Sequence, residues 1–476
     1  MRQVRLVAAA QLRLFLRSRL ALVALLLLAM LSAIAAVTGA GQAARIAADR
    51  QTAQAAAEAA FTAQPDRHPH RMVHYGTYAL RPLGPLAAFD PGVDAFAGSL
   101  IYLEGHRQNA STLGAARESS GLIRFGLLTP AFVLRVLVPL LLVFIGFAMI
   151  VAERHAGLMT LQLSHGVGWK HYVAGKALAL GAVAGLAALP ALLALGWAAA
   201  RAPEESVPAL AMALSSVLWL LIWVLGITLV SARARTAQSA LLTLVLAWAV
   251  LVILVPRAAA GVAAIAHPLP TKAETDLAIH DELRRVGDSH NPDDPHFAAF
   301  KARLLKQYGV TRTEDLPFNY RGALSAEGER LTSELFADHA ADLARIQLTQ
   351  QQLVSLAGLA SPAIGFAQAS MAGAATDLGS HLAFLEAAEA HRYRLIQSLN
   401  RLHTFEVRAE DDAARSRDPL AEQRSRISAR FWAQQKPFTF TGPSPSDRLA
   451  AMLPGLGVML LWAVLLGLLL MRQRAV

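Results

Sequence analysis

Four histidines stand close together in the first third of the chain, and imidazole is a common ligand of transition metals in proteins. His68, His70 and His74 lie in the segment HPHRMVH, and His106 follows further along. A metal site is one interpretation of this pattern. The other, which we favour, places them as hydrogen-bonded residues of a loop at a membrane-proximal surface. They are therefore weak metal candidates, and the sequence predicts no cofactor on this chain.

No catalytic motif can be read elsewhere in the sequence. His381 and His391 flank two glutamates on a predicted helix, but H-E-x-x-H is absent, and so is G-x-S-x-G. The Gly175-Lys176 pair lacks the upstream glycine and following hydroxyl of a phosphate-binding loop, so this chain cannot hold ATP in the usual way. The acidic run 410–412 reads as a solvated turn. We therefore predict that the chain is not an enzyme.

The elements that must position these residues are set by hydropathy. A helix needs about 20 mainly apolar residues to cross the hydrocarbon core of a bilayer. Six stretches of the sequence qualify: 20–38, 131–151, 172–200, 209–230, 237–255 and 449–471. Hydrophobic residues make up 55% of the chain and charged residues 16%, which also indicates a membrane protein. Arg135, inside the second stretch, is predicted to snorkel to the headgroups.

The basic residues predict the orientation of these spans. The net charge is +10, which raises nucleic-acid binding as a possibility, but the arginines and lysines gather in the short segments next to alternate span ends. Because cytoplasmic loops carry an excess of Lys and Arg, both termini are predicted to lie in the cytoplasm. Nucleic-acid binding is therefore not expected. The Ala-, Arg- and Gly-rich composition suggests a bacterial chain, so we predict a multi-pass protein of the inner (cell) membrane with its large domains in the periplasm.

The segments between the spans complete the predicted organisation. Residues 1–19 form an interfacial amphipathic helix, and 472–476 a cytoplasmic tail. A first periplasmic region, 39–130, begins as a helix and becomes irregular after Pro65. The larger one, 256–448, contains a helix with apolar residues at helical spacing over 331–356 and a second helix that starts after Thr376 as N-cap. These two helices predict a hairpin that stands on the membrane. The fold class is thus an all-α integral membrane protein with six transmembrane helices.

The loop between the second and third spans, 152–171, carries the most diagnostic short pattern. The residues that form this pattern are Glu153, Arg154, Gly157, Leu158, Leu161 and Leu163, and the Gly175-Lys176 pair follows them. This loop resembles the first cytoplasmic loop of type-2 ABC-transporter permeases, although Leu158 stands where a Thr is usual. The resemblance implies a short coupling helix that docks on a separate ATPase subunit. The alternative is an ordinary amphipathic connector.

A second resemblance covers nearly the full length. Residues 74–109, 123–132 and 361–400 are similar to a subfamily of these permeases with a large periplasmic insertion of unknown function. The resemblance implies a membrane-spanning transport subunit, with exporter as the expected direction. It also implies a cytosolic ABC ATPase partner that holds ATP and Mg, and a second permease subunit, identical or related. The lipid bilayer is the remaining partner.

A different class of function also fits the sequence. The predicted outer domains are large relative to the spans, so ATP energy on the partner could move a periplasmic arm that acts on an envelope partner, without a solute crossing the bilayer. A periplasmic enzyme is a third class, but it requires a catalytic set that the sequence does not contain. Transport and mechanotransmission are therefore the two hypotheses to compare.

Overall fold

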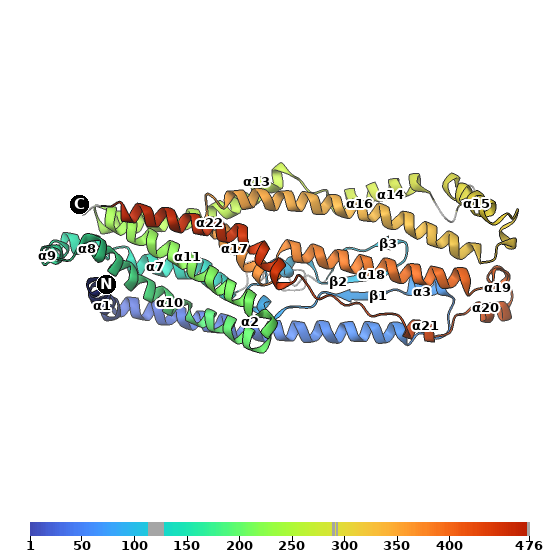
Figure 1. The fold of residues 1–476 in the computed structure, drawn as a ribbon, viewed down its shortest axis with the longest axis horizontal. Helices are drawn as coiled ribbons and strands as arrows, with labels where there is room; N and C mark the ends of the chain where they lie inside the picture. Colours follow the sequence, from blue (N-terminus) through green and yellow to red (C-terminus); the bar gives the residue numbers. More distant parts are fainter. Residues whose placement is uncertain (113–127, 288–290, 292–293, 474–476) are drawn as a thin grey trace.

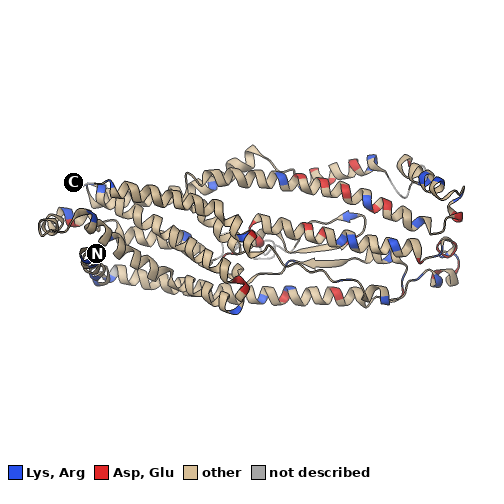
Figure 2. Ribbon diagram, viewed as in Figure 1, with Lys and Arg blue, Asp and Glu red and all other residues tan. Residues whose placement is uncertain are grey.

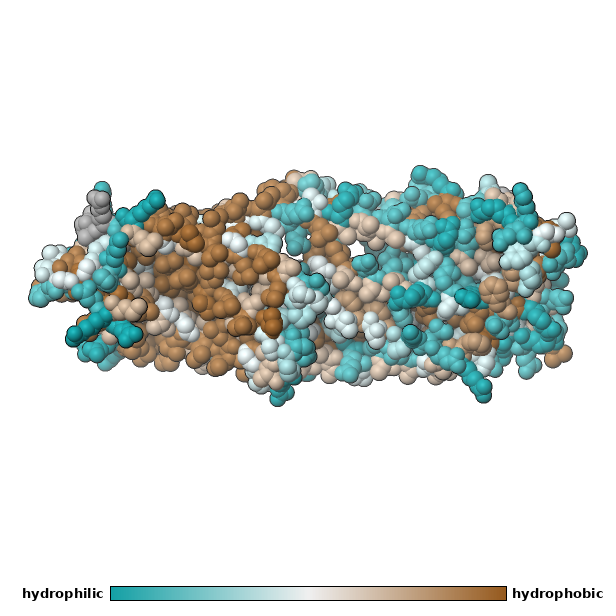
Figure 3. Space-filling model, viewed as in Figure 1, coloured by the Kyte–Doolittle hydropathy of each residue, from teal (hydrophilic) through white to brown (hydrophobic). Residues whose placement is uncertain are grey.

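The computed structural model describes residues 1–112, 128–287, 291 and 294–473. The molecule is a long rod, with an apolar helical bundle in one half and a more polar, mainly helical part in the other (Figure 1). Brown, apolar side chains cover the visible face of the bundle, and teal, polar side chains dominate the other half (Figure 3). Both ends of the chain lie at the far tip of the bundle (Figure 1). The rod therefore has one half suited to a bilayer and one suited to water.

Six helices of the described residues are long and apolar enough to cross a membrane, as the sequence predicts. They are α2 (Arg19–Thr62), the continuous run 130–155 that includes α6 (Pro130–Phe132), α7 (Val138–Gly146) and α8 (Val151–His155), α10 (Trp169–Arg201), α11 (Ser206–Arg233), the run from α12 (Ala237–Trp248) to α13 (Val255–Ala266), and α22 (Pro445–Met471). A short helix, α1 (Arg2–Arg17), precedes them, and α9 (Leu158–Ser164) follows α8.

Two of these helices contain a wider π-helical turn. These turns are η3 (Val133–Leu137) in the second span and η5 (Ala249–Leu254) in the fifth. A π turn disturbs the regular backbone hydrogen bonds, and in an apolar bundle the freed carbonyls need other donors. For the carbonyls of η3, the donors are indole N–H groups. Trp219 donates to the Leu134 carbonyl at 3.0 Å, and Trp248 donates to the Val136 carbonyl at 3.0 Å.

The polar half is built on helices that continue out of the bundle. α2 runs for 44 residues without a break, about 66 Å at 1.5 Å per residue, so roughly half of it extends beyond the bundle (Figure 1). On it lies a small antiparallel sheet in the order β1-β2-β3. The strands are β1 (Thr77–Leu80), β2 (Leu100–Glu104) and β3 (Arg107–Gln108). The prediction of an all-α chain is therefore wrong for this segment, because its aromatic and β-branched residues pair as strands against α2 and α18.

The remaining elements of the polar half are also mostly helical. The long pair is α16 (Tyr320–Ala357) and α18 (Leu378–Phe405), which lie side by side (Figure 1). The shorter elements are α3 (Pro69–Tyr75), η1 (Pro85–Ala88), α4 (Asp94–Ala97), α14 (Lys272–Val286), α15 (Pro295–Tyr308), η6 (Thr313–Asp315), α19 (Ala409–Ala414), α20 (Pro419–Arg424) and α21 (Arg430–Ala433). The two helices predicted by apolar spacing are present. The second is capped by Asp377, whose side chain accepts from the Ser380 N–H, and not by Thr376.

The Gly- and Ala-rich link between α16 and α18 lies among the apolar helices. It forms α17 (Pro362–Gly373), which is almost wholly buried and packs against α11 and α22. The Ser361 hydroxyl, just before α17, donates to the Leu251 carbonyl in η5. The Trp462 indole of α22 donates to the Leu359 carbonyl at 3.1 Å. The hairpin is therefore not confined to the polar half, because its base is embedded in the bundle.

A charged contact holds the end of the bundle that faces the polar half. Arg448, at the start of α22, lies 2.7 Å from the Glu205 carboxylate, which belongs to η4 (Pro203–Glu205) between α10 and α11. The same guanidinium donates to the Gly373 carbonyl at the end of α17, with a distance of 3.0 Å from Nε. Arg448 is 6% exposed. One side chain thus links three separate segments of the bundle.

We predict that Gly455→Ala destabilises the protein. The backbones of α17 and α22 touch at Gly365 and Gly455, and a Cβ on Gly365 would lie 2.8 Å from the Gly455 carbonyl oxygen. A Cβ on Gly455 would collide with the Gly365 carbonyl in the same way. Since backbone cannot move aside as a flexible side chain does, we expect a loss of about 1–3 kcal/mol, measured by thermal unfolding in detergent. Gly457→Ala, on the same helix with open space at its Cβ, is the control. Equal unfolding temperatures for the two variants would refute the packing role.

Candidate functional site

The loop between the second and third spans forms a compact turn at the end of the bundle that carries both chain termini (Figure 1). It consists of α8, a left-handed Gly157 with φ of 73°, and α9. Because only glycine adopts this conformation at little cost, Gly157 allows the sharp turn between the two helices. Met159 is buried and anchors α9, whereas Leu158 and Leu161 are 48% and 54% exposed. Two neighbouring leucines are therefore left open to solvent at this tip.

Glu153 lies inside this end of the bundle, at the centre of a polar cluster. Its carboxylate is 2.6 Å from the Lys176 ammonium and accepts from the Tyr172 hydroxyl at 2.7 Å. Lys176 is 2% exposed and also donates to the Gln11 side-chain carbonyl at 2.5 Å. A buried charge is costly unless it is paired and hydrogen-bonded, and here each charge has such partners. The Gln11–Lys176–Glu153 bridge thus joins α1, α10 and α8.

Arg154 and His155 fasten the same loop to the end of α11. The Arg154 guanidinium donates to the Ala234 carbonyl at 3.0 Å and also to the Ala232 carbonyl. A His155 ring nitrogen lies 2.7 Å from the Arg235 carbonyl. The last carbonyls of a helix have no partner within it, and cations interact favourably with them. The loop is consequently bound to the fourth span as well as to the third.

Helix α1 packs across the start of α10. Gly175 makes this close approach possible, since a Cβ there would lie 2.6 Å from the Val7 Cβ and 2.9 Å from the Val4 carbonyl oxygen. The buried face of α1 includes Val7, Gln11 and Phe15. The Gln3 amide also donates to the Gly166 carbonyl at 2.9 Å, just after α9. Lysines and arginines gather at this end of the bundle (Figure 2).

A cavity of about 950 Å³ lies where the bundle meets the polar half. Both π-helical turns contribute to it, through Val136 and Val252 among others, and so do α16, α17 and α22. Most of its wall is apolar, with a few polar side chains such as Gln350, Gln368 and Arg135. π-helical turns inside helices are frequent at functional sites. Arg135, for which the sequence predicts snorkelling to the headgroups, is one of the residues that line this cavity.

In the polar half, the structure gathers the histidines into two neighbouring groups. His70, His74 and His106 offer ring nitrogens that all lie within 4.8 Å of one another, and so do the ligand atoms of His68, His403 and Asp412. Burial, and then its histidine neighbours, lower the pKa of His70 to about 3, so this imidazole is neutral at physiological pH. His68 is hydrogen-bonded as predicted, but the prediction of a surface position is wrong for this residue, which is 2% exposed.

The acidic run 410–412 is not a solvated turn. Asp412 is 1% exposed and accepts hydrogen bonds from a His403 ring nitrogen at 2.8 Å and from the Asn319 amide at 3.1 Å. His68 and Arg415 also lie within ion-pair distance of its other oxygen. Burial alone would raise the pKa of Asp412, but the hydrogen bonds from His403 and His68 outweigh it and hold the pKa below its usual range. Tertiary contacts from three other segments therefore keep ionised a carboxylate that the local sequence would leave in water.

Comparison with known protein families identifies the family of this chain. The sequence model of the ABC-2 family transporter proteins matches residues 5–285, more than half of the chain. This chain belongs to that family. A domain of unknown function, DUF3526, matches residues 272–441. A search of curated proteins finds no match. The predicted resemblance to a type-2 ABC permease with a large additional domain is confirmed, and the protein is a multi-pass membrane permease subunit of an ABC transporter.

The predicted coupling residues of the permease divide into two sets. Leu158 and Leu161 are exposed, whereas Glu153 and Arg154 point inward and Leu163 is half-buried. Sequence reasoning missed Tyr172 as a partner of Glu153 and Gln11 as a partner of Lys176, because these residues lie on other helices. The one sequence signal for this cluster was Lys176. A positive charge at the end of an apolar span needs a negatively charged partner when it is buried. Part of the segment 123–132, which carried the subfamily resemblance, lies outside the described residues.

We predict that Gly175→Ala displaces α1 from the permease. The added Cβ would clash with Val7 and with backbone of α1, so we expect trypsin to cut faster at arginines of α1 such as Arg13 and Arg17. The control is Gly181→Ala on the same helix, where a Cβ meets no atom within 4 Å. Cleavage at the same rate in both variants would show that Gly175 does not set the docking of α1.

Proposed function

We propose that this permease is the membrane-spanning subunit of an ABC exporter, driven by ATP hydrolysis on a separate cytosolic ATPase. The observation that carries the proposal is the α8–α9 turn, which presents Leu158 and Leu161 outward and is fastened behind to three helices. Exposed leucines at the polar tip of a membrane bundle suit burial by a protein partner. In this proposal the tip with both termini faces the cytoplasm of a bacterial inner membrane, and the polar half lies in the periplasm.

The contacts behind the turn supply a route for the movement. When the ATPases bind ATP, with Mg, and close, they shift α9. The Glu153–Lys176 pair, with its 2.6 Å contact, passes the shift to α10. Lys176 and Gln11 pass it to α1, which leads into α2, and Arg154 passes it to the end of α11. Three spans therefore tilt together, because the connecting contacts are only 2.5–3.0 Å long and are buried or partly buried.

The cavity lined by both π-helical turns is the proposed exit path of the cargo. It lies between the apolar bundle and the polar half, so a solute leaving the spans would enter it before the periplasm. Its mostly apolar wall with Gln350, Gln368 and Arg135 suits an amphipathic cargo. A second permease subunit, identical or related, completes the proposed assembly. The fifth and sixth spans offer it a surface, since only 17% of the apolar window of each is buried within this chain.

A second function, mechanotransmission, is favoured by the continuity of α2. This helix joins the base of the bundle, near α1, to the sheet of the polar half. Beyond the bundle, Arg50 lies 3.2 Å from the Asp94 carboxylate, and the Gln54 side-chain carbonyl accepts from the Leu80 N–H at 2.9 Å. Tilting of α2 would therefore move the sheet as well. The periplasmic part would then act on an envelope partner while no solute crosses the bilayer.

We predict that Leu158→Ser and Leu161→Ser together weaken ATPase binding. Full burial of a leucine contributes about 1.5–3 kcal/mol, so losing two such contacts should weaken the complex by more than about 10-fold. The measurement is co-purification of the ATPase with the tagged permease from native membranes, together with vanadate-sensitive ATP hydrolysis. Thr160→Ala changes an exposed residue between the two leucines and is the control. Undiminished ATPase recovery from the double variant would remove the coupling role of α9.

Crosslinking the polar half distinguishes the two functions. The natural chain has no cysteine, so two cysteines introduced at Ala326 and Gln397 are the only thiols that a crosslinking reagent can join. Their segments are in contact, because the Gln397 amide donates to the Ala326 carbonyl at 3.0 Å. If the protein is an exporter, it should retain most of its transport-linked activity after α16 is crosslinked to α18. If it is a mechanotransmission subunit that works by moving these two helices, it should lose that activity. Each single-cysteine variant, treated with the same reagent, is the control.

A further inference from the structure

The histidines of the polar half form a group with the composition and spacing of a metal site. His70 and His74 lie one turn apart on α3, so their side chains share a face. Their Nε2 atoms are 3.3 Å apart. Nitrogen ligands at 2.0–2.1 Å around a tetrahedral metal ion are themselves about 3.3–3.4 Å apart. The two imidazoles thus already have the separation that one shared ion requires.

The third histidine reaches them from the turn between β2 and β3. His106 has a positive φ of 64°, which is uncommon for a residue other than glycine and is held here by its surroundings. Its ring centre is 5.9 Å from that of His70 and 5.3 Å from that of His74. An unusual backbone conformation therefore places a third imidazole beside the other two.

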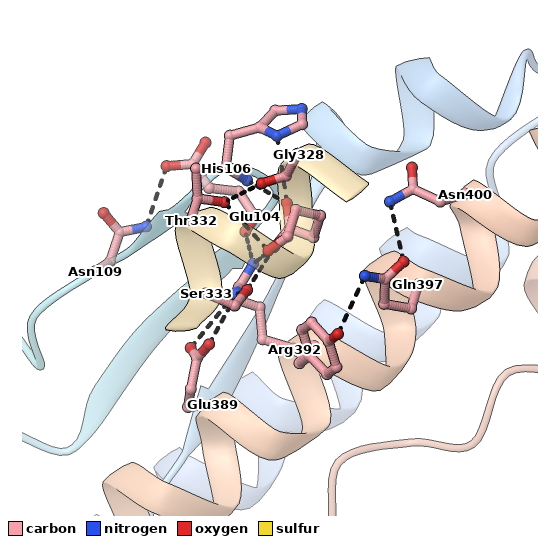
Figure 4. Close-up of polar contacts among 12 residues, drawn as sticks. Glu104, His106, Asn109, Gly328, Thr332, Ser333, Glu389, Arg392, Gln397 and Asn400 are labelled. Carbon is pink, nitrogen blue, oxygen red and sulfur yellow. Dashed lines mark hydrogen bonds and ion pairs between the residues drawn. The ribbon is translucent and has the colours of Figure 1, made fainter. Parts of the chain in front are cut away.

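Glu329, on α16, orients His106 from behind. The carboxylate accepts from the His106 backbone N–H at 2.8 Å, and it lies 3.3 Å from the ring Nδ1. Metal-binding histidines are usually oriented in this way by a carboxylate on the second ring nitrogen. Glu329 is fully buried and is paired with Arg392 at 2.5 Å. Figure 4 shows Arg392 extending from α18 toward Ser333, with His106 at the edge of the same network.

The two groups of histidines differ in how their ring nitrogens are engaged, and in the first group the His70 Nε2 faces the His74 Nε2 at 3.3 Å. The His70 Nδ1 is buried and has no hydrogen-bond partner in the described structure. The neighbouring group is different, because His68 already accepts from the His70 N–H through Nδ1, and Asp412 is neutralised by Arg415. His68 thereby caps α3 and fixes its first turn. The second group positions the first and has less capacity for an ion.

We propose that His70, His74 and His106 bind a divalent transition-metal ion such as Zn²⁺. Three imidazoles favour ions of the zinc, copper and nickel class over Mg²⁺ or Ca²⁺, which prefer oxygen ligands. A three-histidine site leaves a fourth position for water or a further ligand. His74 is exposed, so the ion can enter from solvent. The ion would join the β2–β3 turn to α3, and through Glu329 it would connect both to the DUF3526 region.

The test is zinc binding by the full-length permease in detergent, purified without a polyhistidine tag. Titration against a chromogenic chelator should give one equivalent per chain for the unaltered protein. His74→Ala, at an exposed position, should lower the affinity by at least about 10-fold. His280→Ala removes an exposed histidine from α14 and should leave binding unchanged. Co²⁺ in place of zinc should give the absorption bands of tetrahedral nitrogen coordination, and these should disappear in His74→Ala.

Two controls keep the proposal open to refutation. Zinc should raise the thermal unfolding temperature of the unaltered protein and of His280→Ala, but not of His74→Ala. All three should unfold at similar temperatures without metal, which excludes misfolding as the cause. The site is refuted if the unaltered protein binds no stoichiometric zinc, or if His74→Ala binds it equally well. Binding that survives His74→Ala but is lost in His403→Ala would assign the ion to the buried group and overturn the proposal.

Discussion

Lipid offers no hydrogen bonds, so a polar group inside the apolar bundle is stabilised only by a partner within the protein. This constraint explains the main contacts of the spans. Trp219 and Trp248 donate to carbonyls of the first π-helical turn, and Ser361 donates to the second. Arg448 satisfies the end of α17 while it is paired with Glu205. Each such bond links two elements that would otherwise be free to slide in an apolar environment.

The same constraint makes the base of the permease a coupled unit. Lys176 has to be paired because it is buried, and its partners belong to two other helices, α8 and α1. α8 therefore cannot move away from the Lys176 ammonium without a large cost in free energy, because the buried charge would lose its partner. Because α1 is followed directly by the long α2, the connection extends from the exposed leucines of α9 to the sheet in the polar half. A rod of this kind is suited to carrying movement along its axis.

Contacts between distant segments also give the polar half its character. The histidines and Asp412 come from α3, from the β2–β3 turn and from α18 and α19. They meet because α18 packs on α3 and on the sheet. Arg392 and Glu329 join α18 to α16 in the same region. Buried polar residues such as His68, Asp412 and Arg392 are therefore concentrated at the junction between the segment after α2 and the DUF3526 region.

The sequence alone determined the membrane class, the six apolar helices and the permease family, because hydropathy and short motifs depend only on local residue order. It also located α16 and α18 by their apolar spacing. It could not place the Gly- and Ala-rich link inside the bundle, since small residues suit both a loop and a close helix contact such as Gly365 with Gly455. It also missed the strands after Pro65, the partners of Glu153 and the burial of Asp412. These depend on which distant segments meet, and that is decided only when tertiary packing removes water and forces each charge to find a partner.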